Sequence, residues 1–199
     1  MMVEALISMV VLAVATTFTP GPSTILAAAS GASFGVRRTI PLMAGVAVAL
    51  ATLMAAAAAG LMAVIQAVPS IHIVVKVLGS AYLLWLCWRI SRASPGGGGP
   101  TMLASPLGFG AGMTTLLANP KAWSMAIAAS ATYSNLLSST TMLAVVLGIV
   151  FAVSAILATL FWCAGGVMLG NRLRSARQWK IVNPILSGLT AASIIPLWL

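Results

Sequence analysis

Long apolar stretches dominate the sequence, and most of its charged residues fall in short segments between them. Six stretches can be separated, at about 5–30, 40–64, 71–90, 107–133, 141–169 and 181–199. Each is close to the roughly 20 residues that a helix needs to cross a bilayer. Lipid cannot satisfy backbone amides, so segments of this kind are expected to be helical. The predicted fold class is therefore an all-α membrane protein with about six transmembrane helices.

Composition supports lipid as the surroundings of this chain. Hydrophobic residues make up 61% of the sequence and charged residues only 6%, whereas a soluble domain carries about 25% charged residues. The net charge is +9, but the ten Lys and Arg residues are scattered among the apolar stretches. This distribution indicates loop charges that fix topology rather than a nucleic-acid surface. The expected partners are the lipid bilayer and a small molecule, and no nucleic acid is expected.

The basic residues occupy alternate loops between the predicted spans. They are Arg37 and Arg38; Arg89 and Arg92; and Arg172, Arg174, Arg177 and Lys180. The two remaining loops carry no charge. Because basic loops stay in the cytoplasm, the pattern predicts both termini on the extracytoplasmic side of the cytoplasmic membrane.

A glycine-rich segment divides the chain into two halves of three spans each. Residues 94–100 read Ser-Pro-Gly-Gly-Gly-Gly-Pro, which is the composition of a flexible linker. We therefore predict one transmembrane domain, 1–199, with halves 1–90 and 107–199 joined by the linker 91–106. With three spans per half, the second half must insert with the opposite orientation, as in the inverted repeats of transporters.

Proline interrupts the first span of each half, at Thr19-Pro20-Gly21-Pro22 and at Asn119-Pro120-Lys121. Proline lacks a backbone N–H group and disfavours helical geometry in the preceding residue, so both spans are expected to open there. Unwound backbone at membrane depth is tolerated only against protein or a cavity. Its carbonyl groups, with the N-terminus of the following half-helix, form an ion or carboxylate site. The alternative is a structural kink.

Two further side chains are candidates for this site. Lys121 is far from either end of its predicted span, and a charge in that position is by default a functional hypothesis. Its ammonium would pair with a substrate carboxylate, unless the span begins later and Lys121 reaches the membrane interface. Tyr82 lies deep in the third span, where a role in the cavity and a role in the core are equally compatible with its position.

The remaining residues exclude several kinds of chemistry. The chain has one acidic residue, Glu4, and one histidine, His72, so it cannot build a Ser/His/Asp set or a histidine–carboxylate metal site. There is no nucleotide-binding motif of the Walker A type. Neither an enzyme nor a bound cofactor is therefore expected. A carboxylate relay for protons, and a buried counter-ion for a cationic substrate, are also unexpected.

Several motifs, in this order, resemble the LysE/RhtB family of amino-acid exporters. They are Thr19-Pro20-Gly21-Pro22, then Lys76-Val77-Leu78-Gly79-Ser80-Ala81-Tyr82-Leu83, and finally Asn119-Pro120-Lys121-Ala122. The resemblance implies a secondary carrier of the bacterial inner membrane that exports amino acids or related small metabolites, driven by the membrane potential or a proton gradient. Many members carry an acidic residue in the second span, but the corresponding stretch here, 46–52, has none. This departure favours neutral over basic substrates.

Together, residues and resemblance predict a substrate site between the two opened helices. Its expected members are Thr19, Pro20, Gly21, Pro22, Tyr82, Asn119, Pro120 and Lys121. Two alternatives are a membrane scaffold or assembly protein that transports nothing, and a passive channel. Patterns of small residues such as Gly31-x-x-x-Gly35 permit a homodimer, although packing within one chain uses the same pattern.

Overall fold

The computed structural model describes residues 2–60 and 105–172, together with single residues between 73 and 103 and between 178 and 192. The elements formed by these residues are all helices, which confirms the all-α class. Most of the proposed linker 91–106, and the continuous course of the predicted third and sixth spans, lie outside the described residues.

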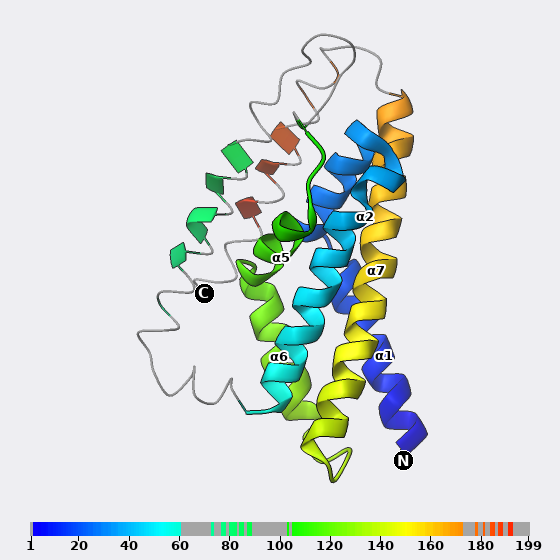
Figure 1. The fold of residues 1–199 in the computed structure, drawn as a ribbon, viewed down its shortest axis with the longest axis vertical. Helices are drawn as coiled ribbons and strands as arrows, with labels where there is room; N and C mark the ends of the chain where they lie inside the picture. The colour runs from blue at the N-terminus through cyan, green and yellow to red at the C-terminus, as the bar shows by residue number, and fades with distance from the viewer. Residues whose placement is uncertain are drawn as a thin grey trace.

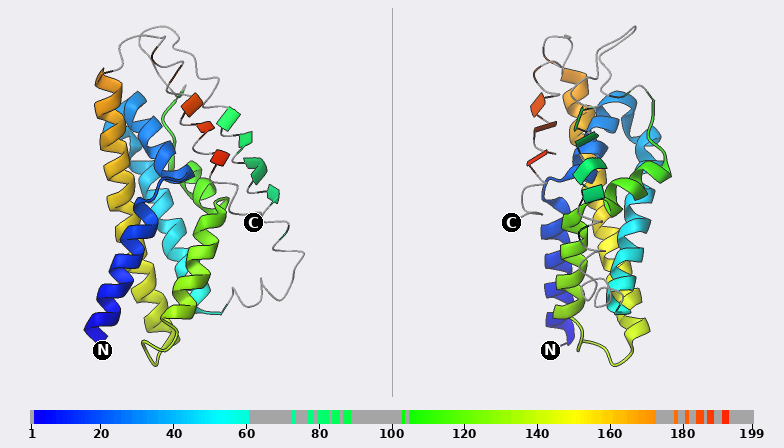
Figure 2. Two further views of the ribbon diagram at one scale, coloured as in Figure 1. Left: turned by 180° about the vertical axis from the view of Figure 1, so that it is seen from behind. Right: turned by 90° about the vertical axis from the view of Figure 1, so that its left-hand side faces the viewer.

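The two proline-interrupted spans run in opposite directions. The first consists of α1 (Met2–Phe18) and the beginning of α2 (Pro22–Ala58). The second consists of α5 (Phe109–Leu117) and α6 (Pro120–Thr132), followed by α7 (Thr140–Arg172). Figure 1 shows α1 leading away from the end that holds the N-terminus, whereas α6 leads toward it, and the two views of Figure 2 agree. This antiparallel arrangement is the one that inverted repeats require.

A single glycine separates the first two spans. At Gly35 the backbone has a φ of 77°, which lies in the left-handed region that favours glycine. An added Cβ at Gly35 would meet no atom within 4 Å, so conformation, and not packing, requires glycine here. The apolar pattern predicts a loop of about nine residues at this point. The helices instead continue up to the turn, and after it Arg37 and Arg38 are good helix formers.

The described arginines gather at one end of the bundle. Arg37 and Arg38 lie two and three residues after Gly35, and Arg172 ends α7. Figure 1 shows the end of α7 beside the turn of α2, at the end of the bundle opposite the N-terminus. The charge pattern and the fold therefore agree on which helix ends share a side of the membrane.

Glycine allows α2 and α7 to pack with their backbones in close contact. A Cβ at Gly166 would overlap the backbone of Ala28, and a Cβ at Gly31 would overlap the backbone of Cys163. Small residues of this kind are typical of helix pairs in membranes. These glycines thus serve packing within one chain. The backbones of α2 and α5 are in similarly close contact. A Cβ at Gly45 would overlap the backbone of Phe109, and a Cβ at Gly112 would overlap the backbone of Leu42.

The helices are apolar toward the outside and carry hydroxyl groups inside. Ile149, Val153 and Phe161 on α7 are about half exposed or more, as expected of side chains that face lipid. In contrast, Ser30 and Thr39 are fully buried and their hydroxyl oxygens lie 2.9 Å apart. The apolar exterior differs from the polar surface of a soluble helical bundle, and it fits a bilayer as the solvent.

Candidate functional site

The two proline interruptions meet at one cavity. Its wall includes Thr19 and Gly21 from the first interruption and Asn119 and Lys121 from the second. Side chains of α1, α2, α5, α6 and α7 complete the wall, and about 430 Å³ of space inside it is free of protein atoms, the open mouth included. The interruptions therefore face each other across an open cavity.

Local sequence explains why α2 restarts after the first interruption. Pro22 occupies the first helical position, where its fixed φ suits the helix and its missing N–H costs nothing. The N–H of Gly21 donates to the Thr24 hydroxyl oxygen at 2.9 Å. That hydroxyl in turn lies 2.9 Å from the carbonyl oxygen of Gly21. Thr24 thus anchors the new helix end, and the N-terminus of α2 is held beside the cavity.

At the second interruption, other residues start the new helix in a similar way. The side-chain oxygen of Asn119 accepts a hydrogen bond from the backbone N–H of Lys121 at 3.1 Å, which makes Asn119 the N-cap of α6. Pro120 again stands at the first helical position. The motif Asn-Pro-Lys therefore starts a helix and places Lys121 within its first turn.

Each interruption leaves a carbonyl that a tryptophan satisfies. Pro22 has no N–H for the carbonyl of Phe18, and the indole Nε1 of Trp162 donates to that oxygen at 3.1 Å. The N–H of Lys121 is turned to Asn119, and Trp123 Nε1 donates to the freed carbonyl of Leu117 at 2.7 Å. Backbone carbonyls that face lipid or protein need such partners, so the two indoles stabilise the opened backbone.

Replacing Trp162 with phenylalanine should therefore destabilise the first interruption. The ring would keep most of its packing, but the carbonyl of Phe18 would lose its donor, at a cost of about 1–3 kcal/mol. The midpoint of thermal unfolding in detergent should fall accordingly. An unchanged midpoint would show that water or another group satisfies this carbonyl.

Lys121 links the two interruptions directly. Its side chain is half-buried, and its Nζ donates to the carbonyl oxygen of Thr19 at 3.2 Å. Lys121 therefore lies beside the opposite broken helix. Among the described residues of the cavity wall it is the one charged side chain. Glu4, the one carboxylate side chain of the protein, lies in the first turn of α1 and is not part of the wall.

Most other polar groups of the cavity are hydroxyls that the sequence analysis did not single out. They belong to Thr16, Thr17, Ser23, Thr24 and Thr159. A signal was present, because four of them lie within four residues of the first proline interruption, inside an apolar span. Thr159 is distant in sequence and reaches the cavity only through the packing of α7 against α2.

Comparison with known proteins decides the family. The model of the LysE type translocator matches residues 14–197, nearly the whole chain. The chain belongs to the LysE-type translocator family. It is accordingly an integral membrane protein of a transport family, which agrees with the apolar exterior and the interrupted spans.

Three relatives of this LysE-type translocator carry the same description, cysteine/O-acetylserine efflux protein. The relative from Klebsiella pneumoniae is 30% identical over 151 residues, which cover 76% of each chain. The relative from Salmonella paratyphi A is 30% identical over 176 residues, covering 86% of this chain and 87% of the relative. The relative from Escherichia coli K12 is 28% identical over a stretch of the same coverage. No solved structure matches the chain.

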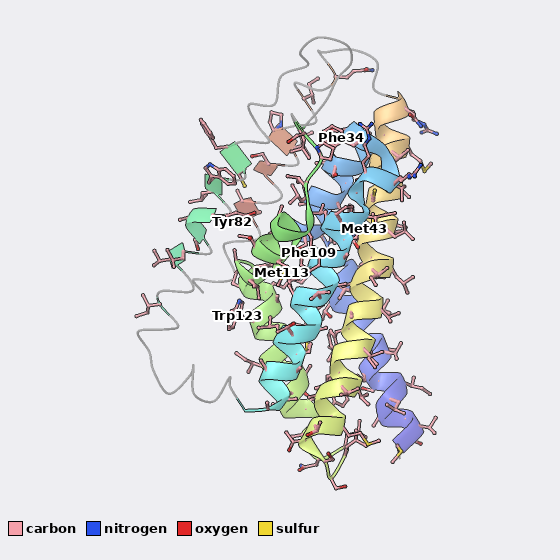
Figure 3. The ribbon with its side chains drawn as sticks, viewed as in Figure 1. Phe34, Met43, Tyr82, Phe109, Met113 and Trp123 are labelled. Atoms are coloured by element: carbon pink, nitrogen blue, oxygen red, sulfur yellow. The ribbon has the colours of Figure 1, made fainter. Side chains whose placement is uncertain are left out.

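The translocator brings together half of the residues expected at the site. Thr19, Gly21, Asn119 and Lys121 line the cavity, whereas Pro20, Pro22 and Pro120 shape its backbone without being part of the wall. Tyr82 is not part of the wall either. Its hydroxyl oxygen lies 3.0 Å from the hydroxyl oxygen of the buried Thr115, and Figure 3 shows its ring beside α5. Tyr82 therefore contacts α5 through Thr115.

Proposed function

We propose that this LysE-type translocator exports small neutral amino acids, such as cysteine or O-acetylserine, across the cytoplasmic membrane. The observation that carries the proposal is the cavity where the two interruptions meet, since its wall combines one cation, several hydroxyl groups and no carboxylate. The names of the relatives support the same substrate class.

The charge of the cavity favours neutral over basic substrates. A neutral amino acid brings a carboxylate, which Lys121 can pair with, and an ammonium, which backbone carbonyls can accept. Lysine or arginine would bring a second cation that needs an anionic partner. Burying a charge without a partner costs several kcal/mol, and the cavity wall offers no acidic side chain.

The position of Lys121 supports transport by alternating access. Its hydrogen bond to Thr19 crosses from α6, in the second half, to the end of α1, in the first. A substrate carboxylate would compete with the Thr19 carbonyl for this ammonium. Binding would thus loosen one contact between the halves, which then rock relative to each other. This movement would expose the cavity alternately to the two sides of the membrane.

Flux through the purified protein in liposomes tests the proposal. Radiolabelled cysteine, serine and O-acetylserine should each cross in a saturable manner, whereas lysine and arginine should cross no faster than in empty liposomes. Equal rates for lysine and serine would contradict the preference for neutral substrates. Flux that rises linearly with concentration would indicate a channel, and no flux of any amino acid would favour a scaffold.

A further inference from the structure

Ser23 is an exception among the buried polar side chains of the described residues. Its hydroxyl oxygen is buried without a hydrogen-bond partner, and only 7% of the residue is exposed. An unsatisfied buried hydroxyl is costly and calls for an explanation. Ser23 belongs to the cavity wall, so a molecule bound in the cavity would supply the missing partner.

The other hydroxyls near Ser23 are already engaged. Thr16 and Thr17 donate to the backbone carbonyls of Leu12 and Ala13, one turn earlier, at 2.6 and 2.7 Å. Thr24 is bound to Gly21. None of these bonds involves Ser23, although each of these residues contributes to the same wall. Among the hydroxyl groups of the first interruption, that of Ser23 therefore remains for a ligand.

The position of Ser23 indicates the charge of that ligand. Ser23 is the second residue of α2, immediately after Pro22. The N-terminus of a helix carries the positive end of its dipole and favours an anionic group. A serine hydroxyl in this position can donate a hydrogen bond to the same group. A carboxylate is the anionic group that an amino acid presents.

The end of α1 offers the opposite polarity in the same cavity. Pro20 has no N–H for the carbonyl of Thr16, and the N–H of Gly21 is turned to Thr24 and away from the carbonyl of Thr17. Both threonines contribute to the wall. Carbonyls at the C-terminal end of a helix favour a cation. The two ends of the interruption therefore present a donor pole and an acceptor pole.

We propose that Ser23 and the N-terminus of α2 bind the α-carboxylate of the substrate, while the carbonyls of Thr16 and Thr17 accept its α-ammonium. The site then recognises the zwitterion common to all α-amino acids, and Lys121 adds charge to the carboxylate pole. This inference rests on the proposed function. It adds Ser23 as a binding residue, and it predicts that a substrate needs both charged groups.

Substitution of Ser23 by alanine tests the carboxylate pole. Since the hydroxyl has no partner within the protein, its removal should leave folding intact, with an unchanged unfolding midpoint in detergent. The KM for serine in liposomes should rise about tenfold, as expected for a lost hydrogen bond to a charged group, with little change in the maximal rate. Ser130→Ala is the matched control, because the Ser130 hydroxyl bonds to Ile127 within α6 and is absent from the cavity wall.

Two serine analogues test the poles separately in the unaltered protein. Serinamide lacks the carboxylate and N-acetylserine lacks the ammonium, so neither should compete with labelled serine. Strong competition by serinamide would contradict the proposed carboxylate pole, and strong competition by N-acetylserine would contradict the proposed ammonium pole. An unchanged KM in Ser23→Ala, with wild-type transport intact, would overturn the role of Ser23 alone. Absence of amino-acid transport by the wild-type protein would instead contradict the proposed function.

Discussion

Replacement of Lys121 by alanine is expected to reduce export of neutral amino acids by about 100-fold while the protein still inserts into the membrane. The substitution removes the one charged side chain among the described residues of the cavity wall. Hydrogen bonds to charged groups contribute about 1.5–3 kcal/mol, which corresponds to roughly 10- to 150-fold in binding. The substitution also frees the Thr19 carbonyl and so removes a hydrogen bond between the halves.

Efflux from cells loaded with dipeptides measures this effect, with the amount of protein in the membrane determined in parallel. Lys121→Met separates charge from size, because methionine fills a similar space without an ammonium, and it should be as inactive as the alanine variant. Arg172→Ala is the matched control for loss of a positive charge, since Arg172 is exposed at the end of α7 and should keep its activity. Wild-type efflux in Lys121→Ala would refute the role of Lys121 in the site.

The interruptions could be predicted from the sequence because their cause is local. Proline removes a backbone donor wherever it stands, so the opening at residues 19–21 and the restart of α6 at Pro120 follow from the residues themselves. The family could also be recognised, because its motifs are short and contiguous. The antiparallel course of the two broken spans followed from counting three spans per half.

The side chains that meet across the cavity could not be predicted in this way. Trp162 is 144 positions from Phe18, and only the packing of α7 brings its indole to the freed carbonyl. Similarly, nothing in the sequence shows which face of the third span Tyr82 occupies, and its contact with Thr115 on α5 is a product of tertiary structure. Ser23 directly follows the first interruption, so its place near the site could be predicted from the sequence. That its hydroxyl has no hydrogen-bond partner is visible only in the structure.

The turn at Gly35 shows a further limit of pattern reasoning. A stretch containing two arginines was expected to form a loop, yet charged residues at the end of a span are compatible with helix as long as their side chains reach the interface. One residue with positive φ is sufficient to reverse the chain. Consequently, the apolar pattern locates the spans but does not determine the length of the connection between them.

Replacement of Gly166 by leucine is expected to prevent the correct packing of α7 against α2. Even a Cβ at this position would overlap the backbone of Ala28, and a helix backbone cannot move aside as a flexible side chain can. Overpacking typically costs about 1–3 kcal/mol, occasionally more, and the upper end is expected here because the obstacle is main chain. Because α7 carries Thr159 and Trp162 to the cavity and the first interruption, loss of this packing should also abolish export.

The adjacent residue provides a close control for this effect. Gly165 is exposed, and a Cβ there would meet no atom within 4 Å, so Gly165→Leu should fold as the wild-type protein does. Size-exclusion chromatography in detergent should give a single symmetric peak for Gly165→Leu and aggregated or absent protein for Gly166→Leu. If both variants behaved alike, the contact between Gly166 and Ala28 would not determine the packing of the two helices. Since the two substitutions add the same side chain to neighbouring positions, hydrophobicity and helix propensity are matched, and any difference reports the helix–helix contact itself.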